Sequence, residues 1–490
     1  MTLVQLSEAV LNHLGAPEKA CYLFSSLQSA HQCIEYATSD QRDDGVAQKP
    51  LAPDEISLRA FLAKDRFAAV IFPREKLPLV ARFWSTTGVS VSSRFAEANL
   101  GHLNSIQEIL IATLDTRNPY FDGDAHQTLR ERIVSYFHRA PLDPLRSKVK
   151  PDDVYLYQSG MASIYKPHTY MQEKYGGRSV LFGMAFMDTI VTMEEFGADN
   201  GFFGLGTDED LRALDAYLRE SRAKGRRVQA IWAEFPANPL LVTPDVARLR
   251  ALATKHDVVL AIDDTIGSWA NIDLLAVADL LVTSITKSFN GYADAIGGAA
   301  VLNPASPKYR ELKALFAARY VPEFYVDDAV AIERNSRDYL TRSATLNANA
   351  LRVVEALQAR AEDSSSAVRQ VHYPTTNPSG AHYRQFMRPA TADFVPGFGC
   401  VFSIELDDLA TTRAFYEALD VHKSVHLGAP FTLAFAYTMC AYKRKLDWAA
   451  RFGLRPTQIR VSVGLEDGDG LVKIFLAAVA AADEVKRAGT

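Results

Sequence analysis

Short apolar runs, each closed by polar residues, recur along the middle of the chain. They lie at residues 154–157, 179–183, 228–235, 258–262, 279–284 and 299–302. Runs of this length that are rich in Val, Ile and Leu are typical of strands buried in a parallel sheet. Amphipathic stretches separate several of them, including one that Asp245 caps. Repeated strand–helix–strand units predict an α/β fold with a doubly wound, mostly parallel sheet.

The regions on either side of these runs have a different pattern. Before them, residues 3–14 predict an amphipathic helix and residues 68–72 a strand, whereas 90–100 fit no element clearly. After Pro304 the pattern predicts long helices at 328–339 and 343–361, then a strand at 399–406. We therefore predict an N-terminal segment (1–110), a large domain (111–330) and a smaller α+β C-terminal domain (331–490).

Composition and charge narrow the class of protein. The chain has 490 residues and a net charge of −5, which argues against nucleic acid or an anionic membrane as a partner. Its four cysteines are scattered and lack the spacing of zinc ligands, so we expect reduced thiols in a cytoplasmic protein without a metal site. We recognise neither a secretory signal nor an apolar run long enough to span a bilayer.

Polar side chains of chemical interest follow two neighbouring predicted strands. Asp263 and Thr265 end one run, and Ser284, Thr286 and Lys287 end the next. Ligands of open α/β sheets bind at the carboxyl ends of such strands. A lysine there can form a Schiff base with a carbonyl, because desolvation lowers its pKa. Pyridoxal 5'-phosphate (PLP) needs this amine, an acid for its pyridine nitrogen and donors for its phosphate.

The lysine region resembles the cystathionine γ-synthase family, the Cys/Met-metabolism PLP enzymes. That family has an Asp-Asn-Thr strand end, then Ser-x-Thr-Lys and a Gly-rich segment that closes on two glycines, here Gly297 and Gly298. Its Arg-x-Ser-x-Gly-x-Glu element matches the sequence from Arg460. The resemblance runs from about residue 90 to the C-terminus, and residues 1–110 resemble the extension of fungal members, with a packing or assembly role. It implies a fold-type I PLP-dependent transferase that forms homo-oligomers, usually tetramers, with sites built from two subunits.

The resemblance also implies which residues hold the phosphate. Gly160 and Met161 lie in a Ser-Gly-Met-Ala element between a strand and a helix, where free backbone N–H groups can bind an anion. Met161 by itself would be interpreted as a core residue. Arg117 matches an arginine that reaches the cofactor of the neighbouring subunit, although a salt bridge at a helix entry is the alternative.

Further roles follow from the same family. Lys287 would carry the cofactor and move protons, Asp263 would hold the pyridine nitrogen, and Thr265, Ser284 and Thr286 would contact the cofactor. Asn238 in Pro-x-Asn-Pro-Leu would donate to the cofactor's phenolic oxygen and contact the substrate, although Asn-Pro alone is only a turn signal. Arg460 would clamp the substrate α-carboxylate, with a strand-edge salt bridge as the alternative.

Three positions near the cofactor depart from the family. Asp115 stands where the family has a tyrosine that contacts the phosphate. Phe186 replaces a tyrosine, so it can stack on the pyridine ring but lacks the hydroxyl; an ordinary core phenylalanine is the alternative. His426 replaces a serine and would bring a titratable group near pH 7 to the catalytic and substrate site, unless it is a hydrogen-bonded loop histidine.

Together these features predict PLP-dependent γ-substitution on an O-acyl-L-homoserine. With cysteine as the acceptor the product would be cystathionine. The departures favour a carbon nucleophile, the enolate of a β-keto acid or an aldehyde, in secondary metabolism. A β- or γ-lyase is a further alternative. A degenerate PLP-binding scaffold is the non-enzyme alternative, and the presence of Lys287, Asp263 and Arg460 counts against it.

Overall fold

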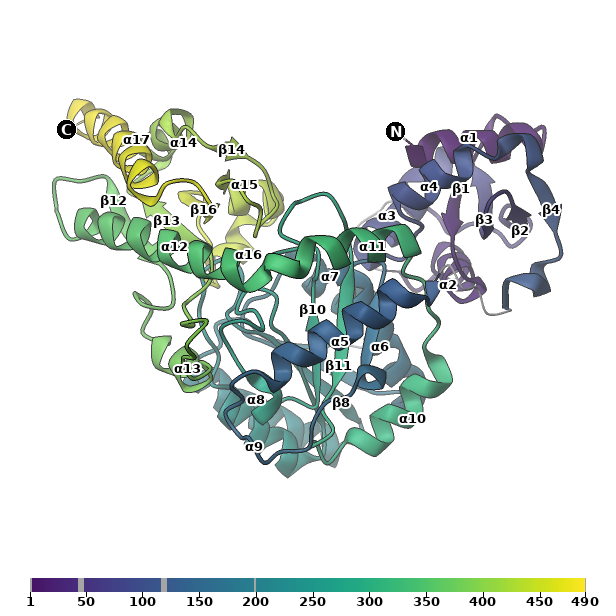
Figure 1. The fold of residues 1–490 in the computed structure, drawn as a ribbon, viewed down its shortest axis with the longest axis horizontal. Helices are drawn as coiled ribbons and strands as arrows, with labels where there is room; N and C mark the ends of the chain where they lie inside the picture. The colour runs from purple at the N-terminus through teal and green to yellow at the C-terminus, as the bar shows by residue number, and fades with distance from the viewer. Residues whose placement is uncertain (1, 43–47, 116–120, 198–199, 490) are drawn as a thin grey trace.

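The computed structural model describes residues 2–42, 48–115, 121–197 and 200–489. Within these ranges a seven-stranded sheet forms the centre of the molecule, and a smaller sheet lies on each side of it (Figure 1). The central strands, in spatial order, are β5 (Val154–Tyr157), β11 (Gly298–Leu302), β10 (Leu280–Thr283), β9 (Val259–Asp263), β8 (Val228–Glu234), β6 (Arg178–Phe182) and β7 (Gly201–Phe203). The apolar runs therefore form strands as predicted.

Strand β11 is the exception to parallel pairing. It pairs antiparallel with both β10 and β5, whereas β10, β9, β8, β6 and β7 pair in parallel. The prediction of a parallel strand at 299–302 was wrong, because a parallel return needs a crossover, usually a helix. Residues 284–297, all of them described, form turns and contain no helix. The sheet as a whole is mostly parallel, as expected.

Helices cover both faces of the central sheet. Side chains of β9 alternate between the faces: Val259 and Ala261 pack on the side of α6 (Gly160–Tyr175) and α10 (Tyr309–Arg319), and Leu260 and Ile262 on the other side. That second side carries α5 (Asp124–His138), α8 (Asp208–Ala223) and α9 (Val246–His256). Asp245 caps α9 as predicted, accepting from the Arg248 backbone N–H. Burial on both faces explains the continuous apolar runs.

The N-terminal sheet is antiparallel and has the order β1 (Lys19–Phe24), β3 (Arg66–Pro73), β2 (Ser57–Leu62), β4 (Gln107–Ile109). Its helices are α1 (Thr2–His13), α2 (Leu27–Thr38), α3 (Leu77–Thr87) and α4 (Ser93–Leu100). One face shares an apolar cluster with the central sheet, where Phe83 packs against Tyr165 of α6 at a ring distance of 6.1 Å. The N-terminal sheet and the central sheet thus share one core.

A C-terminal sheet completes the fold. Its order is β12 (Val368–His372), β13 (Val401–Leu406), β16 (Gln458–Ser462), β15 (Leu433–Phe435), β14 (His422–Lys423). Helices α11 (Val326–Asn335) and α12 (Tyr339–Ala361) lead into it, and a 3-10 turn at Ser336–Asp338 divides the predicted helix at 328–339. The remaining helices are α7 (Met187–Glu195), α13 (Gly380–Gln385), α14 (Leu409–Ala418), α15 (Tyr437–Ala441), α16 (Leu446–Ala450) and α17 (Gly468–Gly489).

The described residues contain neither a membrane-spanning helix nor a group of potential metal ligands. None of the helices in these ranges is long and apolar enough to cross a membrane. In the same part of the chain, no three His, Cys, Asp or Glu side chains are grouped so that they could hold a metal ion.

Candidate active site

A cavity of about 740 Å³ lies where β8, β9 and β10 end, and all three sheet regions contribute to its walls. It brings together every predicted site residue except Arg117: Gly160, Met161, Phe186, Asn238, Asp263, Thr265, Ser284, Thr286, Lys287, His426 and Arg460. Arg117 lies outside the described residues, and Asp115 ends a 3-10 helix, Ile111–Asp115. The volume falls within the range of ordinary ligand pockets.

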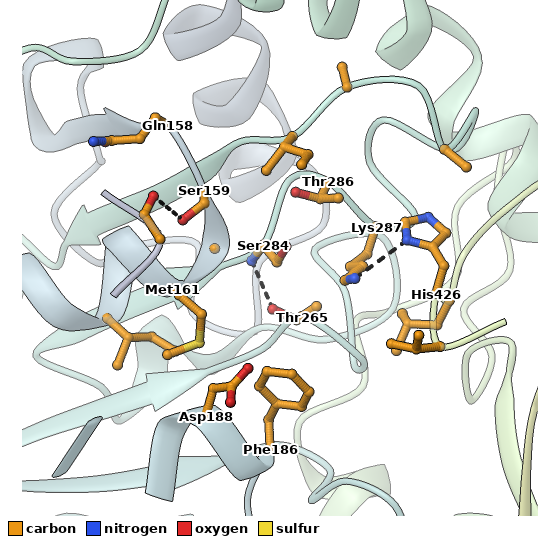
Figure 2. Close-up of a pocket in the computed structure, with 18 of the residues that line it drawn as sticks. Gln158, Ser159, Met161, Phe186, Asp188, Thr265, Ser284, Thr286, Lys287 and His426 are labelled. Carbon is orange, nitrogen blue, oxygen red and sulfur yellow. Dashed lines mark hydrogen bonds between the residues drawn. The ribbon is translucent and has the colours of Figure 1, made fainter. Parts of the chain in front are cut away.

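Lys287 extends into this cavity from the loop after β10. Its Nζ lies 3.5 Å from Nδ1 of His426, which comes from the C-terminal sheet region (Figure 2). Burial, and secondly the positive charge of Arg460, lower the pKa of Lys287 to about 8. A larger fraction of this amine is therefore neutral and nucleophilic near pH 7 than for an exposed lysine.

The protonation of His426 differs from the prediction made from the sequence. Burial lowers the pKa of its imidazole to about 4, and the nearby cations Lys287 and Arg460 contribute further. The expectation of titration near pH 7 was wrong, because the fold buries the ring and also places it beside two cations. Its buried Nε2 has no hydrogen-bond partner among the described residues. His426 is therefore a neutral ring with one nitrogen free at neutral pH.

Two acidic side chains stand next to each other at the ends of neighbouring strands. Glu234 ends β8 and is paired in register with Asp263 at the end of β9. Asp263 Oδ1 accepts from the Thr265 backbone N–H at 2.9 Å. Burial raises the pKa of Asp263. Burial, then the charge of Asp263, raises the pKa of Glu234 to about 8. The strand-end argument that predicted Asp263 also applies to Glu234, which we did not predict.

Helix α6 begins at the cavity and supplies an anion site. Ser159 caps it, because its Oγ accepts from the Ala162 backbone N–H at 3.0 Å. A Cβ atom on Gly160 would lie only 2.6 Å from Cβ of Ser284. Glycine therefore lets the helix N-terminus approach the Ser284 loop, and backbone N–H groups and a hydroxyl meet at one point.

Arg460 and Asn238 form a buried pair. Arg460 is 3% exposed, and its Nη1 donates to Asn238 Oδ1 at 3.1 Å. Its Nη2 donates to the Val425 carbonyl, and its guanidinium lies 4.9 Å from the Tyr437 ring centre. The nearest acceptors are thus neutral, and burial lowers the pKa of Arg460. A carboxylate in the cavity would supply the missing counter-charge.

Phe186 immediately precedes helix α7. Its ring is only partly buried and faces the cavity, on the wall opposite Thr286 and Lys287 (Figure 2). Its backbone N–H donates to Glu234 Oε1 at 2.6 Å. The ring therefore lines the cavity, which an ordinary core phenylalanine would not do.

The N-terminal region forms one wall of the cavity, which was not predicted. Trp84, Ser90 and Arg94 contribute to the lining, and Arg94 Nη1 binds Asp328 at 3.1 Å. A role in packing or assembly, as expected for residues 1–110, is therefore incomplete. No sequence pattern indicated this wall, because these residues lie far along the chain from the strand ends they face.

The donor set fits PLP. It combines an amine of lowered pKa, a buried acid at a neighbouring strand end, a glycine-containing helix N-terminus and the Ser284 hydroxyl. The amine suits the aldehyde of the cofactor, the acid suits its pyridine nitrogen, and the helix N-terminus and the hydroxyl together suit its phosphate. None of the residues in this donor set has a side chain that would conflict with binding of the cofactor.

Two family models match the chain. The model described as Cys/Met metabolism PLP-dependent enzyme covers residues 148–480. The model described as fungal trans-sulfuration enzyme, N-terminal domain, covers residues 2–92. Together they cover the central and C-terminal sheets and strands β1, β2 and β3 of the N-terminal sheet, whereas β4 lies between the two matched ranges.

The chain is also similar over most of its length to individual proteins. The chain is 33% identical to alanine racemase ungC of Aspergillus violaceofuscus, over 96% of this chain and 86% of the relative. It is 31% identical to cystathionine gamma-synthase-like enzyme iboG1 of Amanita muscaria, over 98% and 89%. A crystal structure of cystathionine gamma synthase from Xanthomonas oryzae pv. oryzae, in complex with aminoacrylate and cysteine, matches with a TM-score of 0.59 and 21% identity. That match covers 74% of this chain and 87% of the other, and supports the fold.

Proposed function

This chain belongs to the Cys/Met metabolism PLP-dependent enzyme family, and we propose that it catalyses γ-replacement on an O-acyl-L-homoserine with a carbon nucleophile as acceptor. The observation that carries the proposal is a single cavity that holds Lys287, Asp263 and Arg460 together with Phe186 and His426. The first three side chains serve the chemistry of any amino acid on this cofactor. The other two face the same space, where the family has a tyrosine and a serine.

Lys287, Asp263 and the α6 region have separate tasks in this proposal. Bound PLP supplies an electron sink for charge that develops at Cα. Lys287 Nζ would hold the cofactor at its aldehyde group, and with substrate present the same amine would move the proton at Cα. Asp263 stabilises the protonated pyridine nitrogen, since an opposite charge favours the charged form. The remaining cofactor contacts come from Gly160, Met161, Thr265, Ser284 and Thr286, with Arg117 contributed by the neighbouring subunit of a homo-oligomer.

Arg460 binds the substrate α-carboxylate. Its buried guanidinium donates to two neutral acceptors, Asn238 Oδ1 and the Val425 carbonyl, so an entering carboxylate forms a charge-assisted pair in a medium of low dielectric constant. Asn238, which already accepts from Arg460, lies beside this point and orients both the carboxylate and the cofactor. The amino acid is thereby held with Cα close to Lys287.

His426 is the residue that favours one kind of acceptor over another. A thiol is acidic enough to react with little help, whereas a carbon acid needs a base. His426 is neutral at pH 7 and its Nε2 is unpartnered, so it can accept a proton from the acceptor carbon. Phe186 provides no hydroxyl near the leaving group. This combination favours an enolate acceptor over cysteine.

A competition assay tests the acceptor. The enzyme is given O-acetyl-L-homoserine with cysteine and acetoacetate at equal concentration, and products are identified by mass. We expect a carbon-extended amino acid, lost in His426→Ser but retained in His422→Ser, an exposed histidine of the same segment. Cystathionine as the main product would show that the protein is an ordinary γ-synthase. Formation of a 2-keto acid without incorporation of an acceptor would show that it is a lyase. The lack of any visible cofactor band would show that it is a degenerate scaffold.

Alanine racemisation is a second candidate, favoured by the similarity to alanine racemase ungC along 96% of the chain. It requires proton removal and return at Cα but no leaving group. D-alanine formation from L-alanine, without reaction of O-acyl-homoserines, would replace the γ-replacement proposal.

A further inference from the structure

A continuous chain of hydrogen bonds joins the carboxylate site to the opposite wall of the cavity. Arg460 Nη1 donates to Asn238 Oδ1 at 3.1 Å. The Asn238 backbone N–H donates to Glu234 Oε2 at 3.2 Å. The other oxygen of Glu234 accepts from the Phe186 backbone N–H at 2.6 Å. Glu234 therefore holds two cavity residues at once, one through each carboxyl oxygen.

Within the described part of the chain, Glu234 has no direct ion-pair partner that would explain its burial. It is 6% exposed, and a buried carboxyl group is costly unless its bonds are made. Its hydrogen-bond partners named above are both backbone groups of cavity-lining residues, and Asp263 lies beside it on β9. A carboxyl group in this position is better explained by fixing those two residues than by contributing to core packing.

Tyr437 makes a second link between the same two sites. Its hydroxyl accepts from Asn238 Nδ2 at 3.4 Å and from the Met187 backbone N–H at 3.3 Å, directly after Phe186. Its ring packs on the Arg460 guanidinium. Glu234 and Tyr437 thus connect Arg460 to the start of α7 by independent side chains.

We propose that Glu234 is a positioning residue that couples carboxylate binding at Arg460 to the placement of Phe186 against the cofactor. The inference rests on the proposed role of Arg460, and not on the identity of the leaving group or the acceptor. A carboxylate on Arg460 orders Asn238, Asn238 orders Glu234, and Glu234 fixes the backbone from which the Phe186 ring projects. A ligand with a carboxylate gains from this coupling, whereas a simple amine does not.

The test compares two ligands that lack a leaving group, glycine and methylamine, by the shift each causes in the absorption band of the bound cofactor. Glu234→Gln keeps the volume but replaces one accepting oxygen by an NH₂ donor, so one link is lost. We expect the Kd of glycine to rise about tenfold, with methylamine unchanged. The visible circular dichroism of the bound cofactor, which reports its asymmetric surroundings, should change as well. Tyr437→Phe should change both readouts in the same direction.

Two controls make the outcomes distinct. Glu405→Gln alters another buried strand glutamate, bonded to Gln458 in the C-terminal sheet, and should affect neither readout. Arg460→Ala should weaken glycine alone. If Arg460→Ala weakens glycine and Glu234→Gln does not, the coupling is refuted while the proposed function stands. If Arg460→Ala has no effect, the carboxylate role of Arg460 is wrong. Equal weakening of both ligands in Glu234→Gln with a lowered thermal midpoint would assign Glu234 a structural role.

Discussion

The Nζ of Lys287 lies 3.5 Å from Nδ1 of His426, although 139 residues separate them in the chain. The pKa of each group is lowered from its usual value, and burial is the largest cause in both cases. The charge of Lys287 lowers the pKa of His426 further. At neutral pH the imidazole of His426 is therefore uncharged, whereas the amine of Lys287 loses its proton more readily than that of an exposed lysine.

His426 should titrate far below an exposed histidine. We expect an NMR midpoint at about 4, so that the ring is neutral at pH 6 and above. In Lys287→Met the midpoint should rise, because a neighbouring positive charge is removed. A His426 midpoint near 6.5 would contradict its burial among cations.

Lys287 should be the residue that binds PLP covalently. Lys287→Ala should lose the visible band of the bound cofactor on dialysis, since no other amine takes its place. In the parent protein, borohydride should fix the label on the peptide that contains Lys287. Lys443→Ala, an exposed lysine, serves as the control. A label on a different lysine would show that the cofactor site is elsewhere.

Cofactor uptake should depend on pH through Lys287. The neutral amine attacks the aldehyde, and the pKa of Lys287 is lowered from 10.5 to about 8. The rate of uptake by the cofactor-free protein should therefore rise with pH and level off above about 8. Stopped-flow absorbance measures this rate. A rate that keeps rising to pH 10 would show that the amine is not desolvated.

Arg460→Ala should separate substrate binding from cofactor binding. Loss of a buried charge-assisted pair should weaken amino-acid binding by on the order of 2–5 kcal/mol, with cofactor content nearly intact. Spectral titration with an amino acid measures amino-acid binding, and absorbance after gel filtration measures cofactor content. Arg455→Ala removes an exposed arginine near the same strand and should change neither. Parallel loss of both would indicate that Arg460 is structural.

Gly160→Ala should damage the anion site. The added Cβ would meet Cβ of Ser284 at 2.6 Å, so one segment must shift. Overpacking of this kind costs about 1–3 kcal/mol, and the thermal midpoint and PLP affinity should both fall. Ser284→Gly in the same protein should restore part of the stability. Gly101→Ala, where the nearest atom is 3.9 Å away, should have no effect. An unchanged PLP affinity would place the phosphate elsewhere.

The local pattern of apolar residues was enough to predict many strands of the central domain. The apolar runs predicted β5, β6, β8, β9 and β10, because strands buried on both faces must be apolar throughout. The same pattern placed Asp263 and Lys287 at one sheet edge. Phe186, His426 and Arg460 were identified only through the resemblance, since no local periodicity marks a lone aromatic, histidine or arginine as a cavity residue.

The sequence by itself determined that Asp263 and Lys287 follow neighbouring strands, and its motifs determined the family and with it the cofactor. Only the tertiary structure decided the antiparallel direction of β11, the cavity wall formed by Trp84 and Arg94, the neutrality of His426 and the position of Glu234 between Asn238 and Phe186. Strand direction depends on how a connection returns across the sheet. A pKa and a hydrogen-bond partner depend on groups that folding brings together from distant parts of the chain, and spacing along the sequence carries no record of those distances.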